Sequence, residues 1–132
     1  MAKPTKEDAA LLVQIFATGI SDQKFQEASN WFVYQMNETN YDDFKKKYPI
    51  GSEGYRHFMK ISSYTELLGV LVNHEVLSED LLFEMYGDLM WDKAEPIVRG
   101  LRKELGMPRF LENYEVYAKK FPEWEKNNPA RV

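Results

Sequence analysis

The sequence predicts an all-α fold, a single-domain helical bundle of about five to seven helices. Apolar residues recur at spacings of three and four, capping residues and glycines separate these segments, and no stretch alternates with period two. A chain of 132 residues, 44% of them hydrophobic, builds one core. We therefore expect one domain over residues 1–132, with short tails at 1–4 and 129–132.

Two helices are expected in the first 36 residues. Thr5 begins the first, with acidic residues in its first turn, and Gly19 ends it. Because apolar residues spread over more than half of its circumference, we expect this helix to be largely buried. Ser21 caps the second helix, which presents one face made of Phe25, Ala28, Ser29, Phe32 and Met36.

A short helix and the longest helix follow. The short one begins at Asn40, has two aspartates in its first turn, and ends at the Pro-Ile-Gly turn of residues 49–51. Ser52 caps the longest helix, which runs to about residue 73 or 74. It is so apolar that we expect it at the centre of the bundle.

Three more helices are expected in the second half. Ser78 begins one that ends at Gly87, and Asp88 opens the next. Pro96 lies inside that pattern and is expected to kink or divide the helix, which Gly106 ends. The last long helix starts at residue 108 and carries an aromatic stripe of Phe110, Tyr114, Tyr117 and Phe121.

Charge and composition limit the partners. The net charge is −4, and the only basic cluster is residues 45–47, so we expect no nucleic-acid partner. The longest apolar run, residues 67–72, is much shorter than the ~20 residues of a membrane span, and the chain starts with a polar segment. We expect no membrane partner and a cytoplasmic location. Residues 75–95 form an acidic stretch.

The common catalytic and metal-binding motifs are missing from the sequence. Without cysteine, thiolate nucleophiles and zinc-thiolate sites are excluded. Neither His57 nor His74 follows a glutamate by three residues, the spacing of carboxylate-bridged di-iron bundles. We therefore expect no cofactor and no metal. His57 lies one turn beyond Glu53, which favours a local pair on the helix surface.

Polar residues form one strip on the longest helix. At i, i+4, i+7 and i+11 the strip contains Ser62, Glu66, Gly69 and Asn73. Since apolar residues cover nearly all the rest of this helix, we expect the strip to face the interior. Another apolar face, on the helix that contains Pro96, has Arg102 in its middle and Gly100 beside it. We predict a buried pair of Glu66 with Arg102, or with Arg99 one turn earlier; a Glu66 that faces water is the alternative.

The order of Glu, Gly, Trp and Arg along residues 55–121 is similar to a known family. The matching segments are 64–72, 76–82, Tyr86-Gly87, Trp91, Pro96-Ile97, Arg102 and 110–115. They resemble a family of small bacterial and phage all-helical domains of unknown function. The resemblance implies no activity, and it implies a paired polar core at Glu66 and Arg102. Many members carry a membrane helix ahead of this module, whereas none is recognised in this sequence.

We expect a non-enzymatic protein-interaction or regulatory module. Trp31 and Tyr34 lie off the main face of the second helix, where a homodimer or an unidentified protein partner would bind; coverage by another helix of the same chain is the alternative. Two other functions stay open. With 19 aromatic residues and six methionines, the bundle would line an apolar ligand pocket anchored by Glu66 and Arg102. Alternatively, Glu66 or His57 is the base of an enzyme.

Overall fold

The computed structural model describes residues 3–132, so residues 1 and 2 of the expected N-terminal tail lie outside the described part. Regular secondary structure within this part is entirely helical, which confirms the all-α prediction. None of its helices is both long and apolar enough to cross a membrane. In chain order the elements are α1 (Lys6–Ser21), α2 (Gln23–Asn30), the π-helical turn η1 (Trp31–Gln35), α3 (Tyr41–Lys47), α4 (Glu53–Asn73), α5 (Glu79–Tyr86), α6 (Trp91–Leu105), α7 (Glu112–Lys119) and α8 (Phe121–Asn127).

Most helices begin where capping residues predict. Four caps each accept a hydrogen bond from the backbone amide three residues on, namely Thr5, Asn40, Ser52 and Ser78. The second helix is capped by Asp22 rather than Ser21, because the Asp22 carboxylate accepts from the amide of Phe25. α6 begins at Trp91 and not at Asp88, whose carboxylate instead accepts a hydrogen bond within the preceding turn.

Two helices of the C-terminal half differ from the prediction. α6 continues through Pro96 undivided, because its buried face holds the helix together across the missing N–H. The last predicted helix is divided instead. Residues 108–111 form turns, and Lys120 separates α7 from α8, so Phe110 lies outside the helix.

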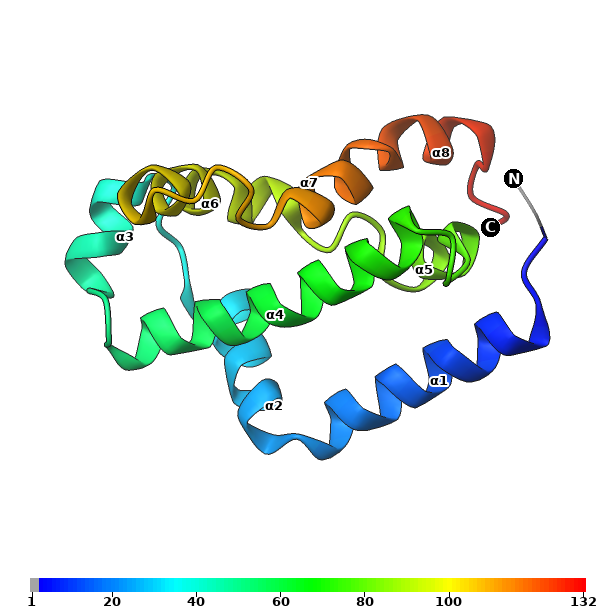
Figure 1. Ribbon diagram of the computed structural model, residues 1–132, viewed down its shortest axis with the longest axis horizontal. Coiled ribbons are helices and arrows are strands. Elements are labelled where there is room, and N and C mark those ends of the chain that lie inside the picture. The colour runs from blue at the N-terminus through cyan, green and yellow to red at the C-terminus, as the bar shows by residue number, and fades with distance from the viewer. Residues whose placement is uncertain (1–2) are drawn as a thin grey trace.

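α4 lies at the centre of the fold (Figure 1). α7 packs along α4 in the most extensive contact between two helices, and α2 with η1 packs against α4 elsewhere. α3 contacts α6 at the end of the molecule opposite the two termini (Figure 1). α1 is peripheral, and its main contact is with α2.

Two helix-interior glycines mark close contacts, each in a different helix pair. A Cβ atom at Gly69 would lie 2.5 Å from the backbone oxygen of Asn113, so α4 approaches the start of α7 closely. A Cβ atom at Gly100 would overlap the ring of Tyr41, which comes from α3. α4 and α6 are therefore not brought together by these two glycines.

The prediction that the first helix is largely buried is wrong. Gly19 is its one buried residue among those described, while Val13, Phe16 and Ile20 remain 66%, 41% and 55% exposed. The physical reason is that the bundle covers only one side of α1, where the half-buried Leu11, Leu12 and Ile15 pack against the core, and the apolar circumference of α1 is wider than that side.

Candidate functional site

A groove of about 600 Å³ lies between α1 and the body of the bundle. We call it the α1 groove. Its walls come from α1, from α2 with η1, from α4, and from the end of α5 with the turn that leads to α6. The apolar residues on its walls include Ile15, Phe16, Phe25, Phe32, Ile61 and Leu68.

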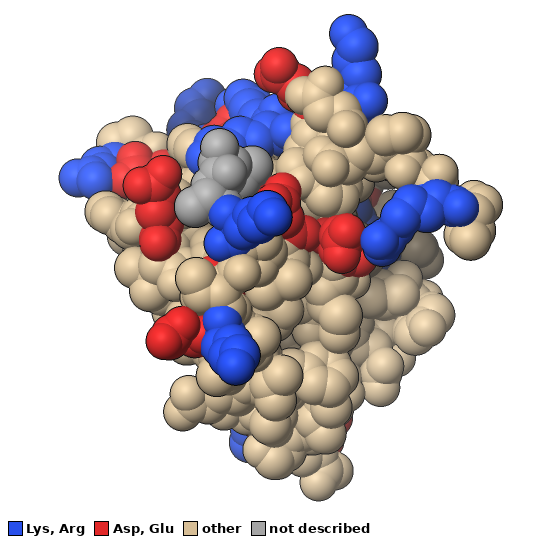
Figure 2. Space-filling model, turned by 90° about the vertical axis from the view of Figure 1, so that its right-hand side faces the viewer, with Lys and Arg blue, Asp and Glu red and all other residues tan. Residues whose placement is uncertain are grey.

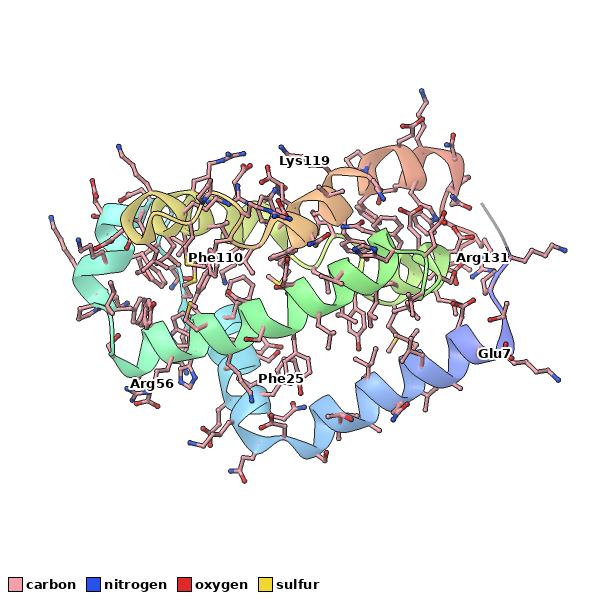
Figure 3. All side chains as sticks on the ribbon, viewed as in Figure 1. Glu7, Phe25, Arg56, Phe110, Lys119 and Arg131 are labelled. Carbon is pink, nitrogen blue, oxygen red and sulfur yellow. The ribbon has the colours of Figure 1, made fainter. Side chains whose placement is uncertain are left out.

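The junction of α1 and α2 closes one end of this groove. The ring of Phe25, which is labelled in Figure 3, packs on Tyr64 of α4, with 4.0 Å between ring centroids. A Cβ atom at Gly19 would lie 3.4 Å from that Phe25 ring, so a side chain longer than alanine would crowd it. Gln26 Nε2 donates to the carbonyl of Gly19 at 3.1 Å, which ties the last turn of α1 to α2.

The turn between α5 and α6 forms another wall and is strained. Leu89 and Met90 line the groove, and both have a φ of 58°, which is unfavourable for residues other than glycine. Two buried tyrosines of α7 hold this turn: the hydroxyl of Tyr114 donates to the carbonyl of Leu89, and that of Tyr117 donates to the carbonyl of Gly87 at 2.6 Å. Backbone strain of this kind clusters at functional sites.

The π-helical turn η1 lies beside the same groove. The amide of Met36 donates to the carbonyl of Trp31 at 2.9 Å, five residues back, and Phe32 and Val33 of this turn line the groove. Lys93 Nζ donates to the carbonyls of Phe32 and Val33, and burial lowers the pKa of this lysine. π-helical turns are rare and occur often at functional sites.

Two of the residues that line the groove from α1, Phe16 and Ile20, belong to an exposed apolar face that reaches beyond it. At i, i+4, i+7 and i+11 it presents an apolar stripe made of Ala9, Val13, Phe16 and Ile20. Residues 9–21 contain no charged side chain. Figure 2 shows charged residues gathered on the upper part of one face, while the lower part, at the height of α1 in Figure 1, is almost entirely uncharged.

The groove itself offers hydroxyl groups and no charge. Its polar side chains are Gln26, Ser29, Thr65 and two tyrosines. Gln26 and Thr65 already donate to backbone carbonyls. The hydroxyls of Ser29, Tyr64 and Tyr86 have no hydrogen-bond partner among the described residues, and burial raises the pKa of the Tyr86 hydroxyl.

The predicted pair of Glu66 with Arg102 or Arg99 is not formed. Glu66 accepts from the amide of Tyr114 at 2.9 Å and from the side chain of Asn113 at 3.0 Å, so it caps the start of α7. It was expected to face α6, but Gly69, one turn on, lets α7 come closer to α4. The polar strip of α4 thus faces inward as predicted, with a different partner.

Arg102 and Arg99 bind one acid of α7. Arg102 NH1 lies 2.7 Å from Glu115 and its Nε donates to the carbonyl of Phe110 at 2.7 Å. Arg99 lies 3.3 Å from Glu115 and 2.7 Å from Glu95. Both side chains of the Arg102–Glu115 pair are 15% exposed, and this pair stabilises the turn before α7.

Of the two residues predicted to form an interaction surface, Trp31 is buried and Tyr34 is exposed. Trp31 is 5% exposed, because three aromatic rings surround it. Phe44 lies in α3, Tyr48 is the C-cap residue of α3, and His57 lies in α4. Tyr34 is 77% exposed and stays a candidate contact residue.

The acidic stretch is partly neutralised, which sequence order alone could not reveal. Glu79 and Glu84 lie 3.7 Å and 3.6 Å from Lys120 and Arg131, respectively, and Asp80 accepts from the indole of Trp124. The stretch therefore supports a partner surface less than expected.

Neither candidate base sits in the α1 groove. His57 Nε2 lies 3.5 Å from Glu53 Oε1, the local pair that the spacing predicts, and its ring packs on Trp31. Both carboxylate oxygens of Glu66 accept hydrogen bonds at the start of α7. The described residues contain no group of three or more His, Cys, Asp or Glu side chains arranged to hold a metal ion.

Sequence reasoning missed the residues of the α1 groove. The apolar residues of the first helix spread over more than half of its circumference, which is typical of a buried helix and predicts no open groove beside it. Nothing in the sequence signals the paired left-handed residues Leu89 and Met90, because neither is glycine or asparagine.

Comparison with models of known protein families relates the chain to one family. The model of a family described as a domain of unknown function (DUF4760) matches residues 4–121, which confirms the predicted resemblance to a family of unknown function. The match starts earlier than residue 55 and includes all of α1 to α7, hence the groove. No curated protein and no solved structure matches the chain.

Proposed function

The chain belongs to the DUF4760 family of domains of unknown function, and since that family name assigns no activity, we propose from the geometry that it is a protein-interaction module. The partner we propose is a second copy of the chain, and the contact is the apolar stripe of α1. The observation that carries this proposal is the exposure of Val13, Phe16 and Ile20 on one side of an uncharged helix.

The spacing of the stripe suits a helix partner. Its residues repeat as i, i+4, i+7 and i+11, the spacing of a seam between two packed helices. The stripe begins with the small side chain of Ala9 and continues with the larger ones of Val13, Phe16 and Ile20. Two copies of α1 packed about a twofold axis would bury the stripe of each copy against that of the other.

Area and charge both favour self-association. With the exposed parts of Met85, Tyr86 and Met90 at the groove, the stripe offers on the order of 600 Å² of apolar surface per copy, near the roughly 800 Å² per partner of a standard interface. A twofold contact uses the same patch on both copies, so any charge in the stripe would be buried twice. Residues 9–21 carry none.

Sedimentation of the full chain over a range of micromolar concentrations tests this proposal. We expect a dimer that dissociates on dilution. Val13→Glu should weaken it by about tenfold or more, because each interface would bury two like charges. Val116→Glu is the matched control, since Val116 is 49% exposed on α7.

Three outcomes would overturn the proposal. A monomer at every concentration removes self-association. Equal effects of the two glutamate variants remove α1 as the interface. A dimer that loses affinity with Tyr34→Ser but not with Val13→Glu moves the interface to η1.

The proposed module is non-enzymatic and cytoplasmic. Glu66 and His57 support the non-enzymatic role because each is engaged in a structural contact away from the α1 groove. Fluorescence imaging of the tagged full-length protein checks the location.

A further inference from the structure

We propose that the α1 groove binds an uncharged, largely apolar small molecule that carries a ring system and one or two hydroxyl or carbonyl oxygens. This site shares Phe16 and Ile20 with the stripe proposed above for self-association, but other residues distinguish the two. Val13 belongs to the stripe and does not line the groove, whereas Ser29 lines the groove and does not belong to the stripe.

The size of the groove sets the size of the ligand. Its volume of about 600 Å³ falls within the roughly 300–1,000 Å³ of small-molecule sites. Walls from four parts of the chain surround it, and the strained turn at Leu89 and Met90 is held from behind by Tyr114 and Tyr117. The floor is therefore preformed, which lowers the ordering cost of binding.

The lining sets the charge of the ligand. Among residues 3–132, no charged side chain lines the groove, and an unpaired ion would be costly to desolvate there. Two lysines near its walls are already engaged. Lys60, with Nζ 6.0 Å from the Tyr64 ring centroid, pairs with Asp22 at 2.8 Å, and Lys93 donates to backbone carbonyls. Neither supplies a free cation for an acidic ligand.

The aromatic, methionine and hydroxyl side chains of the groove set the chemical class of the ligand. Phe16, Phe25, Tyr64 and Tyr86 provide aromatic faces for a ring system. Met85 and Met90 adapt to irregular apolar shapes. The unpartnered hydroxyls of Ser29, Tyr64 and Tyr86 offer hydrogen bonds to a carbonyl or hydroxyl oxygen of the ligand.

A pair of fluorescent probes tests the site on the full chain. N-phenyl-1-naphthylamine is uncharged, and 8-anilinonaphthalene-1-sulfonate has the same ring skeleton with an added sulfonate. We expect the uncharged probe to bind saturably, at one site per chain, at least about tenfold more tightly than the anionic probe. Equal affinity for the two probes, or binding without saturation, would overturn the proposal.

A matched pair of variants locates the binding. Ser29→Leu fills the groove from α2 and should weaken binding of the uncharged probe by about tenfold or more. Ser63→Leu makes the same change on the exposed side of α4 and should leave the affinity unchanged. Equal affinities in both variants, each checked for a cooperative melt, would refute the site. If Ser29→Leu fails to fold, the two-probe comparison still decides.

A third variant separates this proposal from self-association. Val13→Glu should weaken the dimer by about tenfold or more, so that the variant is a monomer at low micromolar concentration, and should retain the probe affinity. If it is a monomer that still binds the probe, both proposals stand. Loss of probe binding in this monomer refutes a site contained within one chain, and a monomeric wild type that binds the probe refutes self-association alone.

Discussion

α7 and α1 lie on opposite sides of α4 (Figure 1), and only α7 packs closely on it. α7 packs so closely on α4 that a Cβ atom at Gly69 would overlap the backbone of Asn113. Across this contact, Asn73 donates a hydrogen bond and Glu66 accepts one. α1 is more apolar and has no charge between residues 9 and 21, yet Val13, Phe16 and Ile20 remain exposed.

The difference shows what places a helix in this bundle. The hydrophobic effect is not directional, so apolar residues alone do not specify a partner. The close contact of α4 and α7 is specified by a glycine that permits approach and by polar groups that require each other. α1 is attached by the half-buried Leu11, Leu12 and Ile15, and at its ends, where Asp8 accepts from the amide of Ser78 at 2.9 Å and Gly19 meets Phe25.

A pair of glycine substitutions should give the largest difference between the two regions. Gly69→Ala places its Cβ atom against the Asn113 backbone, which cannot rotate away, and should lower the free energy of unfolding by about 3 kcal/mol. Gly19→Ala meets only ordinary contact at 3.4 Å and should raise stability by up to about 1 kcal/mol through helix propensity. Urea unfolding measures both, and equal destabilisation would contradict the comparison.

The charged contact beside α7 should give the next largest effect. Arg102→Ala leaves Glu115 and the Phe110 carbonyl without this partner and should cost about 2 kcal/mol of stability. Arg99→Ala, at a side chain 53% exposed, should cost less than about 1 kcal/mol. A double-mutant cycle of Glu66 and Arg102 should show little coupling, because they contact different groups; coupling above about 1 kcal/mol would restore the predicted pair.

The third largest effect is expected from acid, which should weaken the ion pairs of Glu115 on α7. Burial raises the pKa of Glu115, but hydrogen bonds and charge from Lys119 and Arg102 outweigh it and hold the pKa below its ordinary value of 4.5. A carboxylate with a lowered folded-state pKa contributes stability above its unfolded pKa and loses it as the pH falls through the folded value. Stability should therefore fall below about pH 4.5, and Glu115→Gln should make that fall shallower. A Glu115→Gln profile parallel to wild type would contradict this assignment.

The smallest effect is expected on α1. Phe16→Ser removes a side chain that is 41% exposed and should change monomer stability by less than about 1 kcal/mol, measured on the Val13→Glu background so that dimerisation does not contribute. A loss comparable to Gly69→Ala would mean that α1 is held more firmly than its contacts indicate.

Local sequence determined the helical class and most of the helix starts. Thr5, Asn40, Ser52 and Ser78 cap their helices because a side-chain oxygen reaches its own chain's amides only a few residues away. The inward polar strip of α4 followed equally from periodicity. Such features depend on neighbours in sequence, which the sequence lists directly.

Tertiary structure alone decided which surfaces meet. Glu66 faces Asn113 and Tyr114 rather than Arg102, Trp31 is enclosed by α3 and α4, and the acids of α5 meet bases near the C-terminus. Whether an apolar helix is buried depends on how much surface the rest of the bundle leaves for it. For α1 little was left, because α2 and α7 already cover α4, and its apolar residues therefore border an open groove.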